Sequence, residues 1–385
     1  MNILHVATAF KRDKADIITP WMVELLCEQS RRHNVYVLTS GYRRIPSRQH
    51  FRDIDIIRFN YSPSYLQKMT HDSTIAGFIR QHPLYIFLLP LFFITGAYRL
   101  YRTVRIEQID IINVHWPFPL GLMTVPVYLL TDIPIVFTWY GAEFKVAGSS
   151  KLIRLLIKGL SRIASRHIAI SSSTADLLQN STGTENITVI PYGIKIPPKK
   201  HYRKDKFILF AGRLVERKGV EYLIKAMEFI DSEYQLKIAG NGPLLAHLAS
   251  ISDEMDLSER VQFLGFVSDK ELKDLYRRAS VFVLPAVHDR RGDTEGLGMV
   301  LVEAMRYKTP VIATGIGGIV DIVHNNRTGL YSDERDPADI AEKIKMLIEN
   351  KQLYDNLTEN AYCFIEEKFS LGSVTQKYEK VYEEI

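Results

Sequence analysis

Short hydrophobic runs alternate with longer amphipathic stretches through the first half of the chain. The runs that we expect to form strands occupy residues 3–7, 35–39, 55–59, 110–115, 134–138 and 168–170. Short apolar runs separated by patterns of helical period are typical of parallel strands joined by crossover helices. The first half therefore predicts an α/β domain with a doubly wound parallel sheet.

The same pattern restarts after Pro197-Pro198-Lys199-Lys200, which has the composition of a linker. Further apolar runs predict strands over residues 207–211, 235–239, 261–264, 281–284 and 311–313. A length of 385 residues also suits two domains. We therefore expect doubly wound domains over 1–195 and 196–370, with their strand ends facing each other across a cleft.

Composition and charge narrow the class of protein. Hydrophobic residues make up 46% and charged residues 24% of the chain, as in soluble globular proteins. Cys27 and Cys363 lack the spacing of metal ligands, which favours a reducing, cytoplasmic compartment without disulfides. Residues 1–195 carry 22 Lys and Arg against 13 Asp and Glu, whereas the remainder carries 27 against 31. The basic half predicts an anionic partner, either a phosphorylated acceptor or a membrane surface, and no motif predicts nucleic-acid binding.

Two segments of the basic half could contact a membrane surface. Residues 83–98 form the most apolar segment, and Arg99, Arg102 and Arg105 follow it. This segment is shorter than the roughly 20 residues of a spanning helix, and Pro90 interrupts it. It predicts either a core crossover helix or interfacial insertion with the arginines at anionic headgroups. Residues 151–166 carry five basic side chains beside a Leu and Ile stripe, which suits a surface helix or the same docking.

Candidate chemistry is concentrated in residues 292–305. Glu295 and Glu303 lie eight positions apart, separated by a loop, Gly296-Leu297-Gly298, and by the start of an apolar helix over 299–305. A phosphate could bind at the free N–H groups of this helix start, with Glu303 on ribose hydroxyls and Glu295 beside a sugar. The alternative is a buried helix in which Glu303 pairs with an Arg or a Lys.

Cationic side chains follow the first strand of the second half. Arg213 comes after Gly212 at the end of that strand, and Lys218 lies five positions later. An Arg can bind a phosphate through two hydrogen bonds and a Lys as a point charge, so the pair suits a diphosphate. Solvated charges at a helix start are the alternative interpretation.

Several polar and aromatic residues end strands in the first half. His115 ends the run 110–115 and precedes Trp116, so we expect it to be exposed to the cleft and to reach a sugar or phosphate. Glu143 follows the next run and is a candidate for the same reason. Trp116, and Trp21 after the first strand, are further candidates for the acceptor side. The pair Asp53 and Asp55 could suit a metal, but it fits the beginning of a strand better.

The combined motifs resemble the retaining glycosyltransferases of family 4, which have the GT-B fold. The motifs that carry the resemblance are His115, Ile190-Pro191-Tyr192-Gly193-Ile194, Ala211-Gly212-Arg213 with Lys218, Ala239-Gly240-Asn241-Gly242-Pro243, Phe263-Leu264-Gly265-Phe266-Val267, and Glu295 with Glu303. This chain departs from the pattern at Tyr140-Gly141-Ala142-Glu143, where many members have His-Gly-x-Asp.

The resemblance implies two Rossmann-like domains with different partners. The second would bind a nucleoside diphosphate sugar without metal or other cofactor, with Arg213 and Lys218 on the diphosphate, Glu303 on the ribose and Glu295 on the sugar. The first would bind a saccharide or lipid-linked acceptor, and a C-terminal helix over 371–385 would cross back to it. Because the first half is basic and residues 83–98 are apolar, bacterial cell-surface polysaccharide assembly on a lipid carrier, at the inner face of the membrane, is the expected setting.

Three other functions remain alternatives at this point. A GT-B epimerase would turn over a sugar nucleotide without an acceptor, and a binding protein would hold it without transfer. A nicotinamide dehydrogenase requires a G-x-G-x-x-G fingerprint after the first strand, where Ala7-Thr8-Ala9-Phe10 stands instead.

Overall fold

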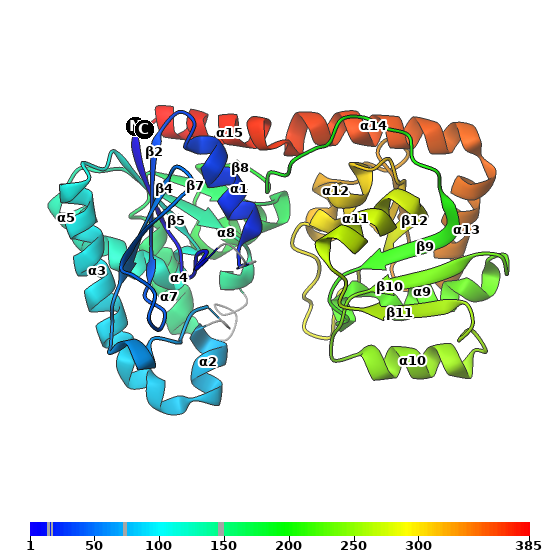
Figure 1. The fold of residues 1–385 in the computed structure, drawn as a ribbon, viewed down its shortest axis with the longest axis horizontal. Helices are drawn as coiled ribbons and strands as arrows, with labels where there is room; N and C mark the ends of the chain where they lie inside the picture. The colour runs from blue at the N-terminus through cyan, green and yellow to red at the C-terminus, as the bar shows by residue number, and fades with distance from the viewer. Residues whose placement is uncertain (14–15, 17, 72–74, 145–149) are drawn as a thin grey trace. The chain divides into compact units, whose positions relative to one another are not determined.

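The chain forms two compact units, each built on its own parallel sheet (Figure 1). The computed structural model describes residues 1–13, 16, 18–71, 75–144 and 150–385. Unit 1 comprises Met1–Ile194 together with Leu371–Ile385, and unit 2 comprises Lys195–Ser370. The division falls one residue from the boundary expected at 195, just before the Pro-Pro-Lys-Lys stretch.

Among the described residues, the sheet of unit 1 has eight strands in the order β3-β4-β2-β1-β5-β6-β7-β8. Its strands are parallel except for β3, which runs antiparallel to β4. The bounds are β1 Asn2–Val6, β2 Asn34–Ser40, β3 Arg48–Phe51, β4 Ile54–Phe59, β5 Ile111–His115, β6 Ile135–Trp139, β7 Arg166–Ala169 and β8 Ile187–Val189. The strand order reverses between β1 and β5, and ligands bind at such switch points in open α/β sheets.

Asp55 belongs to a strand rather than to a metal site. It lies in β4 opposite His50 of β3, and its carboxylate is 3.7 Å from Arg48 and 3.5 Å from His50. Within the described residues, no group of His, Cys, Asp and Glu is arranged to hold a metal ion. The interpretation of Asp53 and Asp55 as the beginning of a strand is therefore the one that the structure favours.

Helices cover both faces of this sheet. On one face, α1 (Pro20–Gln29) packs against α15 (Leu371–Glu383), and Arg32 just after α1 forms an ion pair with Glu379 at 2.8 Å. On the other face, one continuous core joins the helices between β4 and β8. These helices are α3 (Leu89–Ile106), α5 (Val125–Leu130), α7 (Lys151–Ser161) and α8 (Ser172–Thr182), with the short α2 (Ile75–Gln81) and α4 (Pro117–Leu120).

The apolar segment that includes Pro90 forms two consecutive helices. A 3-10 helix, η2, spans Pro83–Leu88, and α3 follows directly with Pro90 in its first turn, where a missing N–H leaves no bond unmade. Phe92, Leu100 and Val104 of α3 are buried in the core beneath the sheet. The segment is therefore a crossover helix of the core on one face, whereas Leu91, Ile94 and Tyr98 on its other face are exposed.

Unit 2 contains a six-stranded sheet with all neighbours parallel, in the order β11-β10-β9-β12-β13-β14. Its strands are β9 Asp205–Ala211, β10 Gln235–Ala239, β11 Val261–Gly265, β12 Ala279–Leu284, β13 Val311–Thr314 and β14 Leu330–Ser332. Two groups of helices pack on this sheet: α9 (Val220–Ala226), α10 (Leu245–Glu254) and α13 (Pro337–Glu349), then α11 (Asp269–Arg278), α12 (Met299–Met305) and α14 (Lys351–Phe369). The order reverses between β9 and β12, which makes the loops after these strands the expected binding region.

The last helix returns to unit 1. Ser370 separates α14 from α15, and Leu371 N–H then donates to Ile194 O at 3.1 Å. Val374, Tyr378 and Tyr382 of α15 are buried with Ile3 and Ile111 of the sheet. The C-terminal helix thus completes the core of unit 1, as the resemblance implies.

Candidate active site

Glu295 lies beside two cations in the loop between β12 and α12. Its carboxylate forms an ion pair with the Lys218 ammonium and lies 3.6 Å from Arg217 Nη1. The side chain of Glu295 is 12% exposed and that of Lys218 is 10% exposed, so solvent screens the pair weakly. Burial alone would raise the pKa of Glu295, but the charges of Lys218 and Arg217 offset this and hold the pKa below its ordinary value. Glu295 is therefore a fixed anion within a cationic cluster.

A glycine-rich turn fixes the backbone of the Glu295 loop. The N–H of Gly318, in the 3-10 helix η6 (Gly317–Asp321), donates to Glu295 O at 3.0 Å. A Cβ atom at Gly318 would lie 2.0 Å from Gly296 O, so only glycine permits this approach. Gly298 has a φ of 87° and caps α12, a left-handed conformation that favours glycine. Gly318 follows β13 in the sequence, so the contact joins the loops after β12 and β13.

Arg213 and Lys218 both follow β9, as expected. Arg213 is exposed, and within the described ranges it forms no ion pair. Lys218 ends the 3-10 helix η4 (Glu216–Lys218) and is buried next to Gly212, where a Cβ would lie 3.8 Å from Lys218 Nζ. The two cations therefore differ: Lys218 is held by Glu295, and the Arg213 guanidinium is available to an anion.

Glu303 accepts a hydrogen bond from a tyrosine. It lies in the middle of α12, half-buried, and the Tyr276 hydroxyl of α11 donates to Glu303 Oε2 at 3.0 Å. Burial raises the pKa of Glu303 above its ordinary value, although the charge of Arg306 opposes this shift. The alternative of an Arg or Lys ion pair is wrong among the described residues, because Tyr276 supplies the direct contact. Tyr276 was missed because a buried tyrosine in an amphipathic helix resembles ordinary core.

The helix that carries Glu303 spans Met299–Met305, the range expected from the apolar run. It begins after Gly298, and Gly296 and Leu297 precede it in the loop. With two turns it contributes little macrodipole. The expected phosphate position at Gly296 to Gly298 stays a prediction.

His115 in unit 1 is not exposed, so that expectation is wrong. Its side chain is 0% exposed, with Nδ1 2.6 Å from the Tyr140 hydroxyl and Nε2 3.0 Å from His5 Nδ1 on the neighbouring strand β1. Burial and the adjacent His5 lower the pKa of His115 well below its ordinary value, which keeps the ring neutral. Residues at the carboxyl end of a central strand reach solvent only where the loops above leave room, and here aromatic rings fill that space.

Four aromatic rings form a cluster around His115. Tyr140 stacks on Trp116 with ring centroids 4.5 Å apart and on Tyr192 at 5.8 Å. Trp21 contacts Tyr192 at 4.5 Å, Tyr140 at 5.4 Å and Trp116 at 6.1 Å. Trp21, Trp116 and Tyr192 are partly exposed, whereas Tyr140 is buried. We call these four residues the aromatic cluster; the sequence proposed Trp21 and Trp116 and missed the stacking role of Tyr192.

Glu143 is also buried rather than exposed. It is 3% exposed, and its two carboxylate oxygens accept from the Tyr140 N–H at 3.3 and 3.4 Å. Burial raises the pKa of Glu143 to about 7, and backbone N–H groups of the same loop only partly offset this. Glu143 therefore holds the loop that positions Tyr140.

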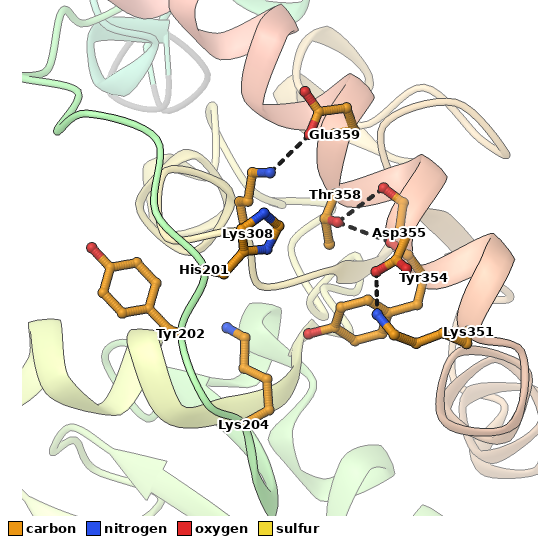
Figure 2. A pocket seen from close by; sticks show the side chains of 9 residues that line it. All are labelled: His201, Tyr202, Lys204, Lys308, Lys351, Tyr354, Asp355, Thr358 and Glu359. Atoms are coloured by element: carbon orange, nitrogen blue, oxygen red, sulfur yellow. Dashed lines mark hydrogen bonds and ion pairs between the residues drawn. The ribbon is translucent and has the colours of Figure 1, made fainter.

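A cavity of about 370 Å³ lies elsewhere in unit 2 and contains none of the predicted donor residues (Figure 2). Its walls bring together basic and acidic side chains, including Lys308, which contacts Glu359 at 2.8 Å. Lys204 projects into it, and burial lowers the pKa of this lysine to about 7. Lys204 Nζ already donates to Thr309 Oγ1 at 2.6 Å, so this lysine has an internal partner.

Known proteins match both halves of the chain. Residues 21–196 match the model of Glycosyltransferase Family 4, and residues 194–364 match that of Glycosyl transferases group 1. An uncharacterized glycosyltransferase of Methanocaldococcus jannaschii is 31% identical over 294 residues, covering 76% of this chain and 81% of that protein. The chain belongs to the group 1 glycosyltransferases.

This glycosyltransferase is also similar to proteins with more specific descriptions. The capsular polysaccharide biosynthesis glycosyltransferase CapM of Staphylococcus aureus is 29% identical over 68% of this chain and 73% of CapM. The crystal structure of HepE from Anabaena, in complex with UDP and glucose, superposes with a TM-score of 0.72 over all of both chains at 18% identity. The likeness in structure confirms the expected GT-B fold.

Proposed function

We propose that this glycosyltransferase moves a sugar from a nucleoside diphosphate sugar to a saccharide or lipid-linked acceptor, with retention of configuration and without a metal. The observation that carries the proposal is the cationic cluster of Lys218 and Arg213 after β9 in unit 2. Lys218 is buried against Glu295, whereas Arg213, which directly follows Gly212 after β9, is exposed. Such a cluster stabilises the charge of a departing diphosphate, because it is oriented before the bond breaks.

The proposed roles follow from the charge of each group. Arg213 and Lys218 bind the diphosphate oxygens, and Glu303, which Tyr276 orients, accepts from ribose hydroxyls. Glu295 stays ionised and accepts from hydroxyls of the transferred sugar, which fixes that sugar over the diphosphate. UDP or GDP is the proposed carrier, and the UDP and glucose seen in HepE support a donor of this class.

The proposed reaction exchanges one bond at the anomeric carbon for another. The bond from that carbon to the diphosphate oxygen breaks with its electron pair on the diphosphate. The acceptor hydroxyl attacks from the same face, and its proton passes to a phosphate oxygen of the leaving group. The cations thus do the work that a metal does in other transferases.

We place the acceptor at unit 1, next to the aromatic cluster. Partly exposed Trp21 and Trp116 offer flat apolar faces, on which the C–H faces of a saccharide pack well. His115 acts as a positioning residue through its hydrogen bond with Tyr140, and Glu143 supports the same tyrosine. The similarity to CapM supports cell-surface polysaccharide assembly as the setting, and the expectation of a reducing compartment from the sparse, unclustered cysteines suits the cytoplasm.

The experiment that tests this function is a transfer assay in EDTA with UDP-glucose and GDP-mannose, using membrane extracts and soluble saccharides as acceptors. Proton NMR of the product reports the anomeric configuration. Transfer with retention in EDTA supports the proposal. An inverted product, dependence on added metal, or epimerised donor without transfer would overturn it.

A further inference from the structure

The helical layer of unit 1 exposes an apolar stripe. Phe87, Leu91, Ile94 and Tyr98 are 76%, 47%, 65% and 63% exposed, respectively. Their spacing of four, three and four residues places them on one face of η2 and α3. Phe92, Leu100 and other side chains of the opposite face enter the core. The segment therefore has two apolar faces, and the sheet covers only one of them.

The exposed apolar surface continues over the neighbouring helices. Leu129 and Leu130 at the end of α5 are 69% and 64% exposed, and Leu152 and Leu155 of α7 are 65% and 66% exposed. The short helix η3 (Gly121–Thr124) joins these elements, because Met123 packs against α3 and Gly121 packs near Leu160 of α7. All three helices contribute to the same core on one face of the sheet (Figure 1). We call their solvent side the outer helical face.

This face is basic as well as apolar. Residues 75–106 contain four arginines, Arg80, Arg99, Arg102 and Arg105, and no Asp or Glu. Residues 151–166 also lack acidic residues and carry Lys151, Arg154, Lys158, Arg162 and Arg166. Of the acidic residues nearby, Glu107 is paired with Arg48 at 2.9 Å, and Asp110, Asp132 and Asp176 are exposed, so basic residues remain in excess. A basic surface of this kind is complementary in charge to an anionic surface.

The geometry decides between spanning a membrane and lying on it. Among the described residues, Pro83–Ile106 is the one helical stretch long and apolar enough to cross a membrane, and 17% of its most apolar window is buried. However, α3 closes the core beneath β4 and β5, so spanning would uncover Phe92, Leu100 and Val104. A helix that keeps one face on its domain and offers the other to lipid lies in the interface plane.

We propose that the outer helical face docks the enzyme on the surface of a bilayer that contains anionic lipids. The apolar side chains of α3, α5 and α7 enter the boundary between headgroups and acyl chains, and the Arg and Lys side chains bind lipid phosphates. A second copy of this chain is a poorer occupant, because two such faces would bring like charges together. The inference goes beyond the proposed function, since it assigns a surface that touches neither donor nor catalytic groups.

The test is cosedimentation of the full chain with vesicles of phosphatidylcholine alone or with roughly one-third phosphatidylglycerol. One double variant, Phe87→Ser with Ile94→Ser, removes apolar contacts with the lipid. A second double variant, Arg102→Gln with Arg105→Gln, removes positive charge from the same face. Phe229→Ser and Lys345→Gln, on exposed positions of unit 2, are the matched controls. Thermal melting establishes that each variant is folded, and donor hydrolysis is measured alongside.

We expect the native chain to bind only the anionic vesicles, more weakly at high salt. The apolar pair should lower the partition coefficient at least about tenfold, and the arginine pair roughly fivefold for each charge removed. Both controls should bind as the native chain does.

Failure of the native chain to bind, or equal binding by all variants, overturns docking. If the native chain does not bind vesicles but forms a dimer, and the Phe87→Ser, Ile94→Ser double variant is a monomer, the face binds a second copy of the chain and docking is overturned. Donor hydrolysis is measured separately from vesicle binding. Loss of hydrolysis with vesicle binding retained would contradict the proposed function alone, and loss of vesicle binding with hydrolysis retained would contradict docking alone.

Discussion

The Lys218 ammonium contacts the Glu295 carboxylate across the end of the sheet in unit 2, and both side chains are almost fully buried. The pair joins residues 77 positions apart, from the loops after β9 and β12. Because these strands flank the switch point of the sheet, the two charges lie where a ligand of an α/β domain binds. Glu295 therefore orients the cation that we assign to the diphosphate.

We expect Lys218→Ala to lower kcat by roughly 100-fold or more, because it removes a preorganised charge from the leaving group. Glu295→Gln should also lower kcat, and the double variant should lose less than the sum of the two free-energy changes, because the residues are in contact. Arg217→Ala is the matched control, since Arg217 also approaches Glu295 but has no assigned role at the diphosphate. Steady-state kinetics measure these effects; additive losses, or an equal loss for Arg217→Ala, would contradict the assignment.

Tyr276→Phe should weaken nucleoside diphosphate binding roughly fivefold, since it removes the hydroxyl that orients Glu303 and leaves a half-buried carboxylate without that donor. Loss of this bond raises the pKa of Glu303 further, so the defect should be larger at pH 6 than at pH 8. Calorimetric titration at both pH values measures the effect. Tyr307→Phe, whose ring stacks on Tyr276, controls for packing. Equal affinity of Tyr276→Phe and the native chain at both pH values would remove Tyr276 from the site.

Glu143→Gln should change how stability depends on pH. The pKa of Glu143 is about 7 in the folded chain, against 4.5 when exposed. Between pH 4.5 and 7 the Glu143 carboxyl is therefore protonated in the folded state and ionised in the unfolded state. The native chain loses stability as the pH rises through this range. The shift corresponds to at most about 3 kcal/mol. Chemical denaturation from pH 4.5 to 8 should show a stability difference between Glu143→Gln and the native chain that grows with pH; a constant difference would mean that Glu143 is ionised throughout.

His115 should not titrate at neutral pH. Burial and the neighbouring His5 lower the pKa of His115 well below 6.5, so its ring stays neutral between pH 5.5 and 8. Two-dimensional NMR of labelled histidines should show an imidazole signal that is constant over this range. The signal that disappears in His115→Gln identifies the residue. A titration midpoint near 6.5 would show that His115 is exposed and would restore a direct role in acid or base chemistry.

The sequence predicted most strands because buried parallel strands are continuous apolar runs. It missed β3, whose residues Arg48–Phe51 are mostly polar, because an edge strand needs no buried face. It also missed β8 and β14, which have only three residues each and therefore carry no periodic signal. Elements whose pairing depends on neighbours rather than on their own composition are the ones that pattern alone does not reveal.

For the site, the sequence identified charges but not their partners. Glu295, Glu303, Arg213 and Lys218 were recognisable because carboxylates and cations at strand ends need an explanation. The contact of Lys218 with Glu295 and that of Tyr276 with Glu303 are long-range, so no local spacing encodes them. His115 was placed correctly at the end of β5, but its burial depends on the rings of Trp21 from α1 and Tyr140 after β6. The assigned roles of these residues, and the cleft expected between the domains, stay predictions.

The most direct test of the central claim is calorimetric titration of the chain with UDP, GDP, ADP and NAD in EDTA. Arg213→Ala and Glu303→Ala are titrated alongside, and Lys225→Ala, from a surface pair on α9, is the control. We predict binding of one nucleoside diphosphate, UDP or GDP, at roughly micromolar Kd, weakened at least about tenfold in both site variants and unchanged in the control. Binding of NAD alone, or of a diphosphate only after metal is added, would contradict the account.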